Sequence, residues 1–159
     1  MDNNIMKKAS ESCVEQIYQI RPEHLNGAGR LFGGRLMEWI DEVAGLVGIR
    51  HSQNNVITAS VDNLKFIRGV FQNNLVILIG NITYVGNTSM EIRVDTYVEN
   101  LHGTRYPVNR AYLTLVAVDE NGAPVKVPGL LIESIGQQAE WEAGQKRKQL
   151  RMQRKIEGF

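Results

Sequence analysis

The chain of 159 residues suits one domain with a substantial hydrophobic core, and its 43% hydrophobic and 22% charged residues are ordinary for a globular protein. A formal net charge of +1 gives no electrostatic reason to expect nucleic acid or a membrane as the main partner, and no apolar run reaches the length of a membrane span. The single cysteine, Cys13, excludes an internal disulfide, and the N-terminus lacks the apolar core of a signal peptide, so we expect a cytoplasmic protein.

The first two elements expected along the chain are a strand and a long helix. β-Branched and aromatic residues predict the strand over residues 13–20. From Gly33 to about His51, apolar residues recur at helical spacing and cover almost the whole circumference of the expected helix, which predicts that the helix is buried. These apolar residues are Leu36, Met37, Ile40, Val43, Ala44, Leu46 and Val47. Gly45 and Gly48 each cost about 1 kcal/mol relative to alanine inside a helix, so we expect another backbone close to them.

After the helix, the hydrophobic pattern changes to a period of two. It predicts four strands, over residues 55–67, 74–86, 89–99 and 105–118. The connections are too short for parallel crossovers, so we expect an antiparallel meander. With the helix covering one face, the fold class is α+β.

The C-terminal segment differs in composition from the rest of the chain. Residues 137–157 are polar and predict a helix with clustered lysine and arginine. We therefore expect one domain over residues 1–135 and a basic helical tail over residues 136–159. A solvated helix end is the favoured interpretation of the tail. Attraction of substrate phosphates is the alternative.

The glycine-rich segment NGAGRLFGG precedes the helix and raises the question of a nucleotide site. Gly27, Gly29 and Gly33 approximate the dinucleotide-binding motif, but the third glycine comes one position late and no second parallel βαβ unit follows. The three histidines lack metal-ligand spacing, so we expect them on the surface or in loops and expect no metal site: His24, His51 and His102.

The start of the helix could instead polarise a carbonyl group. The first amides of a helix have no acceptor within it, and Gly33 and Gly34 place no side chain in the way of a substrate. Asp41 lies two turns further along, on a face with Met37, Ala44 and Gly45. A carboxylate there is costly unless it is paired or functional. From spacing alone, a catalytic and a salt-bridged or solvated aspartate both stay open.

Three motifs in this order resemble one enzyme family. They are the run N-x-x-G-x-x-F-G-G-x-L-M-x-x-x-D-x-x-A over residues 26–44, VGNTSMEIRV over residues 85–94, and LTLVAVDENGAPVKVP near residue 120. Together they resemble the hotdog-fold acyl-CoA thioesterases, in particular the bacterial and cytosolic acyl-CoA hydrolases. The resemblance covers residues 13–130.

The resemblance implies a fold, an activity and a set of site residues. It implies a long helix wrapped by an antiparallel sheet of about five to six strands, and hydrolysis of acyl-CoA to fatty acid and coenzyme A without metal or cofactor. It implies a homodimer with active sites at the interface, further assembled into a trimer of dimers. The implied catalytic residues are Asn26, Gly34 and Asp41, and the implied substrate-binding residues are Gly33, Gly86, Thr88 and Ser89.

Two rival functions and one departure from the family pattern are also expected to matter. A non-catalytic acyl-CoA sensor usually carries a DNA-binding domain, for which the twelve residues before the first strand leave no room. A hotdog dehydratase or hydratase typically uses a histidine, and His24 lacks the matching pattern. The chain reads RGVFQNN where the family usually has a proline and a Gly-Asp pair, so we expect a loop of different shape there.

Overall fold

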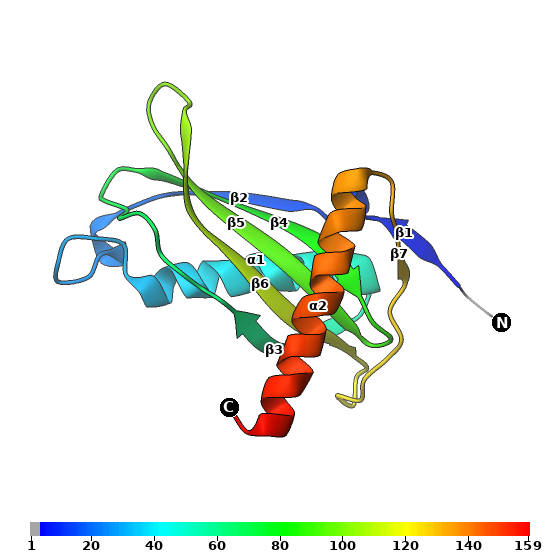
Figure 1. The fold of residues 1–159 in the computed structure, drawn as a ribbon. Helices are drawn as coiled ribbons and strands as arrows, with labels where there is room; N and C mark the ends of the chain where they lie inside the picture. The colour runs from blue at the N-terminus through cyan, green and yellow to red at the C-terminus, as the bar shows by residue number, and fades with distance from the viewer. Residues whose placement is uncertain (1–3) are drawn as a thin grey trace.

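A five-stranded antiparallel sheet with one long helix on each face forms the body of the protein in the computed structural model, which describes residues 4–159 (Figure 1). The strand order is β2-β4-β5-β6-β3. The strands are β2 (Val14–Gln19), β3 (Asn55–Asp62), β4 (Leu75–Val85), β5 (Ser89–Glu99) and β6 (Arg105–Val118). The helices are α1 (Gly33–Ser52) and α2 (Ile135–Glu157). Within the described residues, no helix is long and apolar enough to cross a membrane.

Three of the four strands after α1 form the expected meander, but β3 does not belong to it. β4, β5 and β6 are neighbours in chain order, whereas β3 pairs with β6 at the far edge of the sheet and β2 pairs with β4. The prediction was wrong because residues 63–74 are long enough to cross the end of the sheet, so β3 and β4 need not be adjacent. The Ile67 amide donates to the Val108 carbonyl at 3.0 Å and fixes this crossing.

Helix α1 buries one face against the sheet and leaves the other open in the single chain. The buried side chains recur at three- and four-residue spacing: Leu36, Trp39, Ile40, Val43, Ala44, Val47 and His51. Met37 and Ile49 are each 45% exposed, and Leu46 is 40% exposed. The expectation of burial almost all round was therefore wrong for one chain, because a single sheet covers only one side of a helix.

The glycines of α1 do not mark a close backbone, contrary to the expectation. A Cβ on Gly45 would meet nothing within 4 Å, and a Cβ on Gly48 would meet the side chains of Leu115 and Val56 at 3.3 Å. The close approach lies on the sheet, where a Cβ on Gly80 would be 2.7 Å from a Val43 methyl group. The glycine in β4 therefore lets α1 lie close to the sheet.

Helix α2 covers the face of the sheet opposite α1 (Figure 1). The Ser134 hydroxyl caps its start by accepting from the Gln137 amide at 3.1 Å. The strand β7 (Gly129–Leu131) comes directly before α2 in the chain and pairs in parallel with β1 (Met6–Lys8). A Cβ on Gly144 would lie 2.8 Å from Cβ of Tyr84, so this glycine allows α2 to pack closely on β4. The basic segment is thus a packed layer of the fold.

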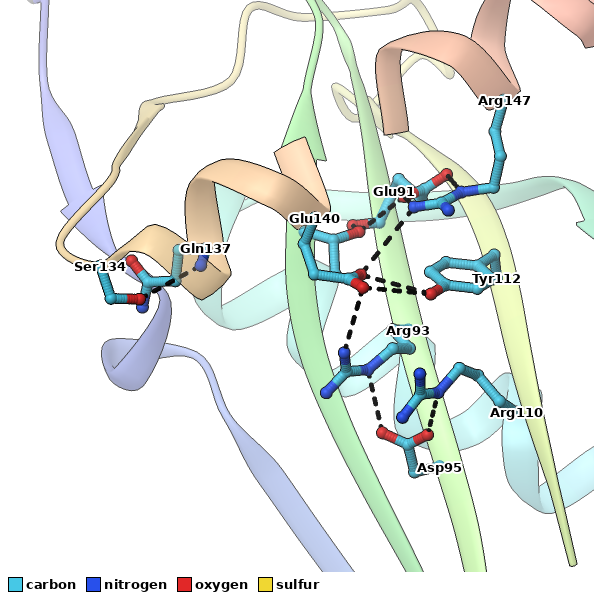
Figure 2. Close-up of polar contacts among 10 residues, drawn as sticks. Glu91, Arg93, Asp95, Arg110, Tyr112, Ser134, Gln137, Glu140 and Arg147 are labelled. Atoms are coloured by element: carbon cyan, nitrogen blue, oxygen red, sulfur yellow. Dashed lines mark hydrogen bonds and ion pairs between the residues drawn. The ribbon is translucent and has the colours of Figure 1, made fainter. Parts of the chain in front are cut away.

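Ion pairs between α2 and the sheet replace the solvated helix end that was favoured for the tail (Figure 2). Arg147 donates two 2.8 Å hydrogen bonds to Glu91, a carboxylate that is 1% exposed and also accepts from Thr83 at 2.7 Å. Arg151 and Arg154 donate to Asp62 at 2.8 and 3.0 Å. Burial opposes the charge on Arg147, yet the hydrogen bonds and charge of Glu91 raise its pKa above the usual value.

His51 is fully buried at the end of α1, so the expectation of surface or loop histidines was wrong for this residue. Its Nε2 donates to the Pro128 carbonyl at 2.8 Å, and Nδ1 is buried without a partner among the described residues. Burial lowers the pKa of His51, and Lys7 nearby acts in the same direction. The neutral ring therefore joins the C-terminal end of α1 to the segment before β7.

Candidate active site

Asp41 and Thr58 meet in a pocket between α1 and the edge strand β3. The Thr58 hydroxyl donates a 2.6 Å hydrogen bond to Oδ1 of Asp41. The pocket has a volume of about 370 Å³, and its lining is mostly apolar: Gly34, Met37, Glu38, Ile40, Asp41, Thr58, Val61, Leu64 and Leu113. One carboxylate oxygen of Asp41 is thus anchored, and the other is available to a substrate.

Gly34 lies in the same pocket as Asp41, at the second position of α1. Amides in the first turn of a helix have no acceptor within it, and they carry the positive end of the helix dipole. Phe32 lies against this glycine, since a Cβ there would be 2.6 Å from the Phe32 ring. The structure therefore brings two of the expected catalytic residues together, a carboxylate and a free amide.

Asn26 does not lie in this pocket but in a second one beside the first turn of α1. Its Oδ1 accepts from the amides of Ala28 and Arg30 at 2.9 and 3.2 Å, which leaves the Nδ2 group as a donor. The second pocket has a volume of about 350 Å³ and is also lined by Gly33. Within one chain, Asn26 and Asp41 thus belong to separate pockets.

Gly86, Thr88 and Ser89 lie at the hairpin between β4 and β5. The Gly86 amide donates to the Ser89 carbonyl at 2.8 Å, and the Ala117 amide donates to the Thr88 carbonyl at 3.0 Å. The pocket that contains Asp41 is lined by none of these three residues within residues 4–159. The structure brings them together with each other, but not with Asp41 in the single chain.

The two pockets beside α1 differ in charge. The pocket of Asp41 also contains Glu38 and has no cationic side chain among the described residues that line it. The second pocket contains Arg30 and Arg68 and no carboxylate among the described residues that line it. We call the second pocket the cationic pocket. Residues 4–159 hold no group of three or more His, Cys, Asp or Glu side chains arranged for a metal ion.

Comparison with known sequences shows the family of the chain. The profile of the thioesterase superfamily matches residues 28–103. An acyl-CoA thioester hydrolase of Bacillus subtilis, named as uncharacterized, is 38% identical over 78% of this chain and 73% of its own length. The cytosolic acyl coenzyme A thioester hydrolase of rat is 34% identical over 94% of this chain, which spans only 40% of that enzyme. The chain belongs to the acyl-CoA thioester hydrolase family of the thioesterase superfamily.

Solved structures agree with the sequence comparison. An apo-hexameric acyl-CoA thioesterase superposes with a TM-score of 0.90 at 32% identity and covers 94% of this chain and 97% of its own. The acyl-CoA hydrolase of Staphylococcus aureus superposes with a TM-score of 0.90 at 30% identity, over 96% of this chain and 94% of its own. That enzyme was solved in complex with butyryl coenzyme A, coenzyme A and coenzyme A disulfide. The expected hotdog fold is therefore confirmed, and the chain is an acyl-CoA hydrolase by family.

The Staphylococcus aureus enzyme has also been solved as three single alanine variants, which change an aspartate, an asparagine and a threonine. Those three positions have the same residue types and the same spacing along the chain as Asn26, Asp41 and Thr58 here. The sequence interpretation missed Thr58, because a threonine in a strand carries no signal of function. Only the placement of β3 beside α1 brings it to Asp41.

Proposed function

We propose that the protein hydrolyses the thioester of acyl-CoA to a free carboxylic acid and coenzyme A in the pocket of Asp41. One observation supports this most directly. A carboxylate anchored by Thr58 shares a largely apolar pocket with Gly34 in the first turn of α1. A thioester needs only polarisation of its carbonyl and a positioned base or nucleophile, and this pocket offers both.

In the proposed reaction the thioester oxygen accepts from the Gly34 amide, where negative charge develops. The free oxygen of Asp41 either removes a proton from the attacking water or attacks the carbonyl carbon itself. In the first route the water oxygen bonds to the acyl carbon and the coenzyme A thiolate leaves and takes a proton. In the second route Asp41 displaces the coenzyme A thiolate, which leaves and takes a proton, and the resulting acyl anhydride with Asp41 is then cleaved by water to the free acid and the carboxylate of Asp41. Thr58 holds the carboxylate in place in both routes.

Asn26 enters this site from a second protomer in our proposal. Its Oδ1 is occupied by two backbone amides, so its Nδ2 group donates to the substrate or to the attacking water. Phe32, directly before α1, and Met37 and Ile49 of α1 are also exposed, at 56%, 45% and 45%. An exposed apolar surface, together with a pocket of Asp41 that Asn26 of the same chain does not line, favours a homodimer with shared active sites. Similar thioesterases form hexamers, so we propose a trimer of dimers.

The remaining expected residues serve the coenzyme A part of the substrate in this proposal. Gly33 adjoins Asn26 in the cationic pocket, and Gly86, Thr88 and Ser89 form the hairpin end of β4 and β5. We propose that the hairpin reaches the substrate across a protomer interface, because it lies outside the pocket of Asp41. We also propose a cytoplasmic location, which the cytosolic rat relative supports.

The test is release of free thiol from a panel of acyl-CoA thioesters of increasing chain length, with the parent and Asp41→Asn proteins. The variant is nearly isosteric but lacks the base or nucleophile, so kcat should fall by roughly 10²-fold or more. Glu42→Gln is the matched control, since Glu42 is an exposed carboxylate next in sequence and does not line the pocket. Parent protein that binds acyl-CoA without releasing thiol would instead be a binding module.

A further inference from the structure

Asp62, the last residue of β3, is a buried carboxylate that two arginines of α2 bind. Its side chain is 8% exposed. Nη1 of Arg151 donates to Oδ2 of Asp62 at 2.8 Å, and Nη2 of Arg154 donates to Oδ1 at 3.0 Å. Each carboxylate oxygen therefore has an arginine of its own. We call Asp62, Arg151 and Arg154 the β3 clamp.

The β3 clamp is separate from the contacts that attach α2 to the middle of the sheet. Arg147 binds Glu91 of β5, and Gly144 lies against Tyr84 of β4. The β3 clamp instead reaches an edge strand, which pairs with β6 alone among the described strands. An edge strand has ladder hydrogen bonds on one side only, so a contact from another layer adds to what fixes its position.

A β-bulge in β3 allows this one strand to bind both helices. The register with β6 shifts between Thr58 and Ser60, which leaves Ala59 as an extra residue. Thr58 and Asp62 are four residues apart, and in a regular strand their side chains would lie on the same face. The extra residue puts them on opposite faces. Thr58 therefore binds α1, whereas Asp62 binds α2.

The residues of β6 opposite these two agree with this difference in face. Thr58 lies opposite Leu115, which is fully buried in the hydrophobic core, and Asp62 lies opposite Tyr112. Directly opposite residues of an antiparallel pair have their side chains on the same face. The Tyr112 hydroxyl donates to Glu140 of α2 at 3.3 Å. The end of β3 is thus held from both sides of the sheet.

The β3 clamp adjoins the wall of the candidate active site. Val61, the neighbour of Asp62, lines the pocket of Asp41, and so does Leu64 just after the strand. Thr58 lies only about 13 Å from Asp62 along the strand, at about 3.3 Å per residue. A displacement of the end of β3 would therefore move the pocket wall and the hydroxyl that anchors the carboxylate.

We propose that the β3 clamp positions Thr58, and through it the carboxylate of Asp41, for hydrolysis of the thioester. This proposal rests on the proposed acyl-CoA hydrolysis. Arg151 and Arg154 do not touch the substrate in it, so they are positioning residues. A small misplacement of the base or nucleophile slows the chemical step, whereas the binding of the substrate depends on other contacts. The basic helix α2 thus serves turnover in addition to covering the sheet.

The experiment compares Asp62→Asn with Asp95→Asn, using the acyl-CoA of the panel that the parent protein hydrolyses fastest. Asp95 is the matched control, since its side chain is also 8% exposed and pairs with two arginines, Arg93 and Arg110, but lies in β5 (Figure 2). In Asp62→Asn, kcat should fall at least about fivefold with KM changed less than about twofold. Asp95→Asn should leave kcat and KM unchanged.

A double-mutant cycle tests whether the β3 clamp acts through Thr58. In the Thr58→Val background, Asp62→Asn should lower kcat by less than about twofold, because the contact through which it acts is already lost. A full loss in that background would overturn the proposal. Parent-like kcat in Asp62→Asn alone, or an equal loss in Asp95→Asn, would overturn it as well.

Arg154→Gln is a milder second variant, because the side chain of Arg154 is 48% exposed and Arg151 stays on Asp62. It removes one of two donors, so kcat should fall by about twofold to fourfold with KM unchanged. Urea unfolding gives the folded fraction of each variant, and kcat is compared per folded protein. Parent-like kcat in Arg154→Gln would contradict the β3 clamp. A parent protein that hydrolyses no acyl-CoA would contradict the proposed function instead.

Discussion

Thr58 of β3 holds Asp41 of α1 through a 2.6 Å hydrogen bond, and this contact joins the edge of the sheet to the exposed side of the helix. The two residues are separated by the whole second half of α1 and by a turn that begins at Gln53, whose φ is +57°. The chain reverses there and returns along the helix as β3. The position of the carboxylate therefore depends on how β3 pairs with β6, in addition to the helix itself.

Thr58→Val should reduce kcat by about tenfold or more without a comparable rise in KM. The change removes the hydrogen bond to a charged group, which contributes about 1.5–3 kcal/mol, and lets the carboxylate rotate. Thr58→Ser keeps the hydroxyl and should retain most of the activity. Steady-state kinetics with one acyl-CoA provides the measurement. Parent-like kcat in the valine variant would show that Asp41 needs no anchor.

The sequence predicted the helix and strands well because their periodic patterns are local. The starts of α1 at Gly33 and of β5 at Ser89 agree with the prediction. The position of β3 could not be predicted, since strand order depends on pairing over long sequence distance. The same limit explains Thr58, which has a partner only because of that pairing. The motif around Asp41 and Gly34 could be predicted because both lie on one helix.

Burial of the second face of the sheet by α2 also could not be predicted from a local sequence pattern. Glu91 alternates with apolar neighbours in β5, so its pattern indicates a solvent-facing side chain. The structure buries it because Gly144 lets α2 come close and Arg147 supplies the opposite charge. An alternating pattern with polar residues on one face of a strand therefore does not distinguish a face exposed to water from a face covered by a basic helix.

Glu91→Gln should lower the free energy of unfolding by roughly 2–4 kcal/mol, because it removes the closer counter-charge of the partly buried Arg147 and leaves only Glu140, at 3.9 Å. The double variant Glu91→Leu/Arg147→Met should recover most of this loss, since apolar groups of similar size often replace a buried ion pair. Urea unfolding at one protein concentration measures both. Equal unfolding midpoints for parent and Glu91→Gln would show that the pair does not hold α2 to the sheet.

His51 should make the protein less stable in mild acid. Its pKa is lowered by burial from 6.5, so near and below that value the unfolded chain binds a proton that the folded chain resists. The unfolded state then binds more protons, and stability falls as pH decreases through about 6.5. Above about pH 7.5 the ring is neutral in both states, so the contribution of His51 to the free energy of unfolding no longer changes with pH.

His51→Gln tests this dependence because the amide can still donate to Pro128 but does not titrate. Urea unfolding from about pH 5.5 to 8 should show a steeper loss of stability in the parent than in the variant. Lys7 and Glu11 influence His51 and are present in both proteins, so the difference isolates the ring. Parallel curves would mean that His51 is protonated equally in both states.

We expect the active site to be shared between two protomers. Asn26 and Asp41 line separate pockets in one chain, so a site that uses both requires either a second protomer or a large rearrangement. In a two-fold dimer, Asn26→Ala and Asp41→Ala proteins should each be inactive alone. A mixed dimer has one site with both changes and one site with neither. Random exchange makes about half of the dimers mixed, so mixing should restore roughly a quarter of the parental activity.

The exchange itself must be shown, for example with a mass-tagged subunit followed by native mass spectrometry. A mixture of tagged and untagged Asp41→Ala protein is the matched control, and it should exchange equally without regaining activity. Because the regained sites are unmodified, they should also have the parental KM, which distinguishes complementation from partial rescue of a damaged site. Full exchange without any regain would place Asn26 and Asp41 of one chain in the same site, and the site would then not be shared.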